Sequence, residues 1–142
     1  MDNKALPEGS TYVWKHSTFD GAGYMKASAF VGGACKDAES WLVSPEVDLT
    51  SATAAKLSFE HALNNLKGGN INDHIALMVK KSGGEWTAVA IPQNPAGNSY
   101  DYVNSGDINL AAYVGGKFQF AFKYVSTTSF SPTWQIRKVV VE

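Results

Sequence analysis

Two stretches of this chain alternate apolar and polar residues with the period of a β-strand. Residues 56–62 read KLSFEHA, which places Leu57, Phe59 and His61 on one face of an extended strand. One face of residues 118–124 carries the aromatic rings of Phe118, Phe120, Phe122 and Tyr124. Because four rings exposed on one side would form a large apolar patch, this face is predicted to point into the core. Phe59 and His61 are then expected to point inward, and Glu60 and Lys123 outward.

These two strands belong to a pattern that occurs twice in the chain at a constant offset. The residues Ser44, Val47, Asp48, Leu49, Lys56, Leu57 and Phe59 correspond to Ser105, Ile108, Asn109, Leu110, Lys117, Phe118 and Phe120. Two strand–turn–strand units of equal spacing predict two sheets, each receiving one unit. The connections at 44–56 and 105–117 are long enough for strands that cross between sheets, as in a jelly roll.

Further short strands are predicted at 11–16, 24–31, 41–43, 74–80, 85–91, 100–103 and 134–141. Ser82-Gly83-Gly84 is a hairpin signal, whereas residues 19–23 are interpreted as a loop punctuated by glycine. No helical period extends over ten or more residues. The pattern therefore predicts an all-β protein, a jelly-roll β-sandwich of two antiparallel sheets.

Composition limits the functional classes. A length of 142 residues fits one domain, predicted at 11–142 after a tail or linker at 1–10. A net charge of −1 provides no field that would attract nucleic acid, and no apolar run has the length needed for membrane insertion. Cys35 is the only cysteine and has no internal disulfide partner. Met1 leads into polar residues without a signal peptide, which indicates either a cytoplasmic protein or a piece of a larger chain, and we expect the piece.

Several ordered motifs resemble a known family. They read YMKASAF, WLVSPEVDL, LSFEHA, SGDINLAAY and FAFKYVSTTSFSPTWQI, and they extend from about Trp14 to Val141. In this order they are similar to the choice-of-anchor J domain, which is itself similar to cleaved adhesin domains. The resemblance implies a jelly-roll sandwich that is usually non-catalytic and lies beside anchors, peptidases or nucleases. It also implies a secreted, periplasmic or cell-surface location in bacteria.

Some members of that family bind calcium near a sheet edge. By analogy with them, and because residues 67–74 are rich in side-chain oxygens, the candidate calcium ligands are Glu60, Asn64, Asp73 and Gln135. The chain departs from the family pattern at three places: FEHA replaces FDHA, Gln135 replaces a glutamate, and Arg137-Lys138 replaces an acidic pair. These departures lower the negative charge available to a cation.

Catalytic motifs are not recognisable. Glu60 and His61 are adjacent, but neighbours in a strand point to opposite faces and cannot act on one substrate atom. There is no G-x-S-x-G elbow, no phosphate-binding glycine loop and no zinc-ligand spacing. The sequence therefore predicts no enzyme. The alternative is a hydrolase in which the fold brings Glu60 together with Asp73 or His74.

A binding module is the favoured interpretation, because sandwich domains carry function on the loops at the ends of their sheets. Those loops supply rings for stacking on sugars, and the candidates are Tyr100, Tyr102 and Phe130. Candidates for hydrogen bonds to hydroxyl groups are Asn94, Asn98 and Ser129. The predicted partner is a glycan or a protein surface, and the alternative is a structural spacer. The four tryptophans, Trp14, Trp41, Trp86 and Trp134, are predicted to pack in the core.

Overall fold

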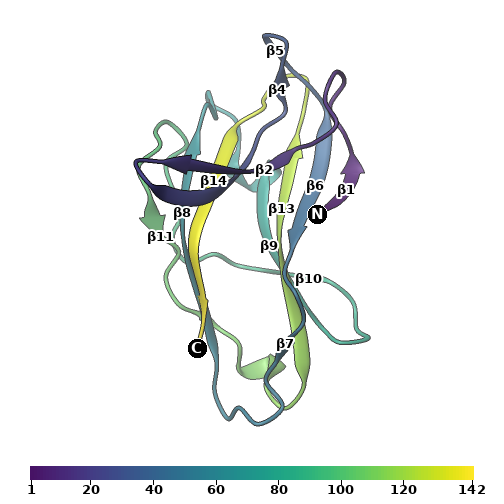
Figure 1. Ribbon diagram of the computed structural model, residues 1–142, viewed down its shortest axis with the longest axis vertical. Coiled ribbons are helices and arrows are strands. Elements are labelled where there is room, and N and C mark those ends of the chain that lie inside the picture. The colour runs from purple at the N-terminus through teal and green to yellow at the C-terminus, as the bar shows by residue number, and fades with distance from the viewer.

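The alternating stretches form the two long central strands, β8 (Lys56–Asn64) and β13 (Lys117–Ser126). The computed structural model describes residues 1–142 and places these strands in two sheets that pack face to face (Figure 1). Leu57, Phe59 and His61 of β8 are buried, as are Phe118 and Phe120 of β13. The predicted inward face of both strands is therefore confirmed.

Each sheet is named here by one of its central strands. The β13 sheet has the order β1 (Asp2–Ala5), β6 (Ala38–Val43), β13, β9 (Ile75–Lys81), β10 (Thr87–Val89), and β7 (Val47–Asp48) pairs with β13. The β14 sheet has the order β11 (Val103–Asn104), β8, β14 (Thr133–Val141), β3 (Ala22–Ala27), β2 (Trp14–Phe19), and β12 (Ile108–Asn109) pairs with β8. Every strand pairing is antiparallel, so the predicted all-β sandwich is confirmed.

Short elements complete the chain. β4 (Phe30–Val31) and β5 (Ala34–Cys35) form a separate small hairpin. The only helices are two single 3₁₀ turns, η1 (Ile71–Asp73) and η2 (Ala111–Tyr113). Neither has the length or the apolar character that crossing a membrane would require.

In the duplicated pattern, the short strand of each unit pairs with the long strand of the other unit. β7, from the first unit, pairs with β13, while β12, from the second unit, pairs with β8. The two serines make matching contacts: the hydroxyl of Ser44 accepts from the Phe120 amide, and the hydroxyl of Ser105 accepts from the Phe59 amide, both at 3.0 Å. Each unit therefore crosses between the sheets, as predicted. The expectation that each sheet receives one unit is corrected, because each sheet takes the long strand of one unit and the short strand of the other.

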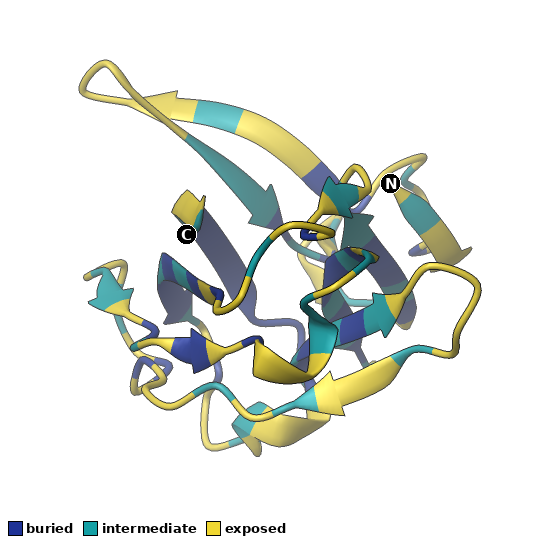
Figure 2. Ribbon diagram, turned by 90° about the horizontal axis from the view of Figure 1, so that it is seen from below, coloured by how far each residue is buried: buried dark blue, intermediate teal, exposed yellow.

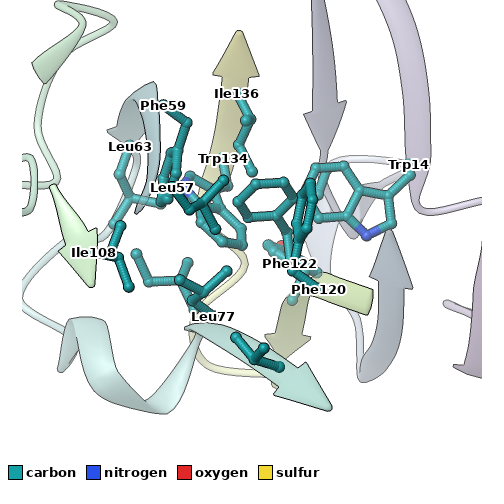
Figure 3. Packing of buried hydrophobic residues seen from close by; sticks show 14 of the residues in the cluster. Trp14, Leu57, Phe59, Leu63, Leu77, Ile108, Phe120, Phe122, Trp134 and Ile136 are labelled. Atoms are coloured by element: carbon teal, nitrogen blue, oxygen red, sulfur yellow. The ribbon is translucent and has the colours of Figure 1, made fainter. Parts of the chain in front are cut away.

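The core lies between the sheets and is built around aromatic rings. Figure 3 shows Trp14, Phe122 and Trp134 packed together; the Trp134 ring centroid lies 5.6 Å from that of Trp14 and 5.8 Å from that of Phe122. The indole Nε1 of Trp134 donates to Nδ1 of His61 at 3.2 Å, and His61 Nε2 lies 2.9 Å from the Gln93 carbonyl oxygen. Burial lowers the pKa of His61, which is consistent with a neutral ring.

Two predictions about the chain's apolar residues and its start are corrected. Trp41 and Trp86 do not enter the core, because the parity of β6 turns Trp41 to the outer face of the β13 sheet, where the two rings meet at 5.5 Å. Residues 2–5, expected as a tail, form β1, because the edge of β6 is open and offers unpaired backbone groups.

Candidate functional site

A β-hairpin extends away from the sandwich and is called the arm here. β2 and β3 pair along their whole length, from Trp14 opposite Ala27 to Phe19 opposite Ala22. Asp20 and Gly21 connect them with φ angles of 51° and 78°, the two positive values that a tight two-residue hairpin turn requires. Residues 19–23 were expected to be a loop, and this is corrected. An Asp-Gly pair between extended segments is itself a strong hairpin signal.

The arm joins the β14 sheet only at its base. β3 pairs with β14 from Met25 to Ala27, and the rest of the hairpin continues without a neighbouring strand. In Figure 1 the arm crosses in front of β14 and points toward β11, and Figure 2 shows it standing clear of the sandwich with mostly exposed or half-buried residues. Side chains of the arm and of β14 together line a space between them.

This space is a cleft of about 390 Å³, called the arm cleft here. Its lining residues come from the arm, from the segment before β11 and from β14; they are Phe19, Ala22, Tyr24, Lys26, Tyr100, Tyr102, Gln135 and Arg137. Phe19 on the arm is 79% exposed and Tyr100 is 47% exposed. Large aromatic side chains are thus accessible on both walls of the cleft. Exposed apolar side chains that gather in one place often mark a binding site.

The rings of the arm cleft differ in their availability. The Arg137 guanidinium lies 3.7 Å from the centroid of the Tyr102 ring and covers one of its faces. The Tyr102 hydroxyl donates to Oε1 of Gln135 at 3.0 Å, and burial raises the pKa of that hydroxyl. Phe19, Tyr24 and Tyr100, in contrast, make no aromatic or cation–π contact. Tyr102 is therefore held in place in the wall of the cleft by Arg137 and Gln135, and the other three rings are free to stack on a ligand.

Gln135 provides the polar floor of the cleft. It follows the buried Trp134 on β14, so the alternation of the strand turns it outward. Its Oε1 is occupied by the Tyr102 hydroxyl, and its Nε2 has no protein partner. An amide fixed in this way presents an oriented N–H donor to whatever enters the cleft.

Two smaller hollows adjoin the arm cleft and share Lys26 with it. One, of about 290 Å³, is lined by Ser129 and Phe130 together with Lys67. The other, of about 170 Å³, lies by Tyr12 and Lys15. Phe130 is half-buried and packs against His74 with ring centroids 6.2 Å apart. Ser129 and Phe130 thus line a separate hollow, which shares Lys26 with the cleft of the tyrosines.

The predicted amide ligands do not reach these hollows. Asn94 lies beside β9 and β10 of the other sheet, where its side chain donates to the Ile91 carbonyl at 3.4 Å. Asn98 is exposed and lines none of the three hollows. Sequence reasoning missed Phe19, Tyr24, Lys26 and Arg137 as lining residues. The Asp-Gly turn could have revealed the first three, because a hairpin places alternate residues of both strands on one face.

The predicted calcium ligands do not converge. Glu60 and Asn64 lie four residues apart on β8, a separation of about 13 Å along a strand, whereas oxygens on one calcium ion lie within about 5 Å of each other. Their polar atoms are also engaged: Glu60 Oε1 lies 3.2 Å from Arg137 Nε and 3.0 Å from Lys138 Nζ, and Asn64 accepts from the Asn65 amide. These residues therefore do not fit a shared calcium ion.

A bulge in β14 explains the environment of Glu60. The register with β8 shifts between Arg137 and Val140, and Lys138 has a φ of 51°. The bulge lets both cations reach the same carboxylate. Burial alone would raise the pKa of Glu60, but the hydrogen bonds and charges of Lys138 and Arg137 outweigh it and bring the pKa below its usual value. Lys123, which was predicted like Glu60 to point outward, lies on the outer face of the opposite sheet.

The residues of the hydrolase alternative are also kept apart. His74 is buried at the start of β9, and its Nδ1 bonds the Val125 carbonyl of β13 at 2.9 Å. Asp73 is exposed in η1. Glu60 lies on the other sheet, where its partners are Arg137 and Lys138. No three His, Cys, Asp or Glu residues of the structure lie close enough together to hold a metal ion.

Comparison with known proteins identifies the fold. The sequence matches no family model and no curated protein, so membership of the choice-of-anchor J family stays a prediction. Among solved structures, TmCBM61 in complex with β-1,4-galactotriose is similar with a TM-score of 0.58 and 14% identity, over 96% of this chain and 86% of that one. The K1 cleaved adhesin domain of Lys-gingipain from Porphyromonas gingivalis W83 is similar with a TM-score of 0.51 and 15% identity, over 92% and 86%. This chain therefore has the β-sandwich fold of a carbohydrate-binding module and of a cleaved adhesin domain.

Proposed function

We propose that this chain is a non-catalytic glycan-binding module and that the arm cleft holds the glycan. The observation that carries the proposal is the pair of opposing walls with uncovered rings, Phe19 and Tyr24 on the arm and Tyr100 before β11. The chain brings together segments about eighty residues apart in sequence to build them. Core packing does not account for rings that remain this accessible.

The chemistry of the arm cleft suits a sugar. Pyranose rings have apolar C–H faces that stack on aromatic side chains, and their edges carry hydroxyl groups that need hydrogen-bond partners. The rings of the cleft supply the stacking surface, and the free Nε2 of Gln135 supplies a donor between them. A volume of about 390 Å³ is in the range of small-ligand sites, and the adjoining hollow with Ser129 and Phe130 offers room for a longer chain.

Other features support a binding role without catalysis. Glu60, whose partner Arg137 lines the cleft, is held by Arg137 and Lys138 and belongs to no cluster of three acidic, histidine or cysteine residues. The neighbours in fold include a module solved with a galactotriose and an adhesin domain. A module of this kind is expected on a larger secreted or surface protein of a bacterium, as the family resemblance also implies.

A glycan array and isothermal titration calorimetry test the proposal. The parent protein is compared with Tyr100→Ala and with the double variant Tyr100→Ala, Tyr102→Ala, and β-1,4-galacto-oligosaccharides are among the ligands. We expect the double variant to lose at least about tenfold in affinity, since removing one stacked ring typically costs 1–3 kcal/mol. Trp86→Ala is the matched control, because that ring lies half-buried on the other sheet.

The outcomes separate this proposal from its rivals. Binding that survives the double variant but disappears in Trp86→Ala would move the site to the other sheet. An array without any hit would favour a structural spacer or a protein partner. Activity on a glycoside, ester or peptide that disappears in Glu60→Gln would restore the hydrolase alternative.

A further inference from the structure

The cavities on the outer face of the β14 sheet carry an excess of positive charge, although the chain as a whole has a net charge of −1. Lys26 borders the arm cleft and both adjoining hollows. Arg137, Lys67 and Lys15 each border one of the three. No aspartate or glutamate lines any of them. The cations therefore border three hollows that share Lys26 and to whose lining no acidic side chain contributes.

The lysines of this region are not neutralised by the protein. Lys15, Lys26 and Lys67 form no ion pair, whereas Lys4, Lys36, Lys56 and Lys138 each have a carboxylate partner. Glu60, on the outer face of the same sheet, pairs with two other cations, Arg137 and Lys138. No ion pair with a protein carboxylate thus balances the three ammonium groups.

The position of two of these lysines is itself unfavourable without a ligand. Lys15 and Lys26 lie directly opposite each other in the β2–β3 pairing, so their side chains share the face that lines the hollows. Like charges directly opposite each other destabilise an antiparallel pair. An anionic group between the two ammonium groups would remove this repulsion, and a neutral sugar would not.

We infer that the glycan bound in the arm cleft is anionic and carries carboxylate or sulfate groups that Lys26, Lys15 and Lys67 recognise. The inference rests on the proposed function and adds the chemical class of the ligand. The uncovered rings stack on the sugar faces, and the lysines bind the acidic substituents at the edge of the cleft. Lys26 is central because it lies where the three hollows meet.

Matched pairs of glycans test the inference by calorimetry. Oligogalacturonate is compared with the same oligosaccharide after carboxyl reduction, and dextran sulfate oligosaccharides with dextran oligosaccharides. We expect at least about tenfold tighter binding of the acidic member in one pair or both, and a loss of most of that preference in about 0.5 M sodium chloride, where charges are screened within a few ångströms. The pair that shows the preference tells whether carboxylate or sulfate is recognised.

Variants connect the preference to the named lysines. Lys26→Gln and Lys15→Gln should bring the acidic-to-neutral affinity ratio toward one, whereas Lys80→Gln, on the other sheet, should leave it unchanged. Lys15→Gln removes a like-charge pair, so its melting temperature should not fall; this check separates lost recognition from lost folding. Equal or tighter binding of the neutral members would overturn the inference and leave the proposed function in place. If no glycan of either kind binds, the proposed function fails and the inference fails with it.

Discussion

Both outer faces of the sandwich carry aromatic rings, but the protein covers Trp41 and Trp86 on the β13 sheet and leaves Phe19, Tyr24 and Tyr100 on the side of the β14 sheet uncovered. On the β13 sheet, Lys4 and Lys123 each lie 5.6 Å from the Trp41 ring centroid, and Lys80 lies 5.0 Å from that of Trp86. The Trp41 Nε1 donates to the Glu39 carboxylate at 3.0 Å. Trp41 thus has its ring and its polar group occupied and is only 9% exposed, and the ring of Trp86 is contacted by Trp41 and Lys80.

The arm makes the difference on the other face. β3 pairs with β14 only from Met25 to Ala27, so the outer part of the hairpin packs on no neighbouring strand. Its face with Phe19 and Tyr24 lies across the arm cleft from Tyr100. The comparison shows that an aromatic residue near a surface is not by itself a binding platform. What matters is whether lysine stems and neighbouring rings already fill the space above it.

The largest expected effect concerns the layer beneath the arm cleft. His61→Asp should lower the free energy of unfolding by about 4 kcal/mol or more, because it places an unpaired carboxylate against Trp134 and Phe59 in the core. Glu60→Ala, one residue away but on the outer face, should cost under about 1 kcal/mol, as partly exposed ion pairs do. Urea unfolding measures both. Equal losses would contradict the assignment of inner and outer faces.

Trp41→Ala should give the next largest effect and sharpen the contrast between the faces. We expect a loss of about 2–3 kcal/mol in stability, below the usual cost for a fully buried tryptophan because this ring lies on an outer face. Glycan affinity should stay at the parent value, since no ring of the β13 sheet contacts the cleft. A variant that folds normally but no longer binds glycan would show that the covered face, too, takes part in binding.

Mild acid should weaken the core beneath the cleft by a smaller amount. The pKa of His61 is lowered by burial below its usual 6.5, so its neutral form stabilises the fold fully above pH 6.5. As the pH falls below 6.5 toward the folded-state pKa, the unfolded chain takes up the proton first and stability drops, by at most about 1.4 kcal/mol per pH unit. Unfolding curves between pH 7 and about 5.5 measure this slope, and His61→Gln should remove the part due to this ring. A parent slope that His61→Gln leaves unchanged would contradict this account.

The smallest expected change in stability is that of the uncovered rings. Tyr100→Ala and Phe19→Ala should each alter the free energy of unfolding by under about 0.5 kcal/mol, because both side chains are exposed and pack on no other ring. Thermal melts of the two variants check this. A loss above about 1.5 kcal/mol in either would mean that the ring supports the arm, and that its accessibility has a structural cause.

The sequence by itself determined the strands and their faces. Period-two alternation is local, so the buried sides of β8 and β13 follow from the residues alone, and His61 and Glu60 were correctly assigned to opposite faces. The repeated Ser44 and Ser105 pattern also indicated the crossings between sheets. The Asp-Gly pair at 20–21 is a local sequence signal for the hairpin turn of the arm.

Only the tertiary structure decided which side chains meet. Strand pairing is non-local, so nothing in the alternation of β6 indicated that Lys4 and Lys123 would cover Trp41. The bulge at Lys138 brings Arg137 and Lys138 to the same carboxylate, that of Glu60. The cleft exists because β3 pairs with β14 only from Met25 to Ala27. Tyr100 and Tyr102 line the same cleft as Lys26 and Gln135, whereas Asn94 lies by the other sheet. The sequence does not indicate this, because the direction in which each loop leaves its sheet depends on contacts far away in sequence.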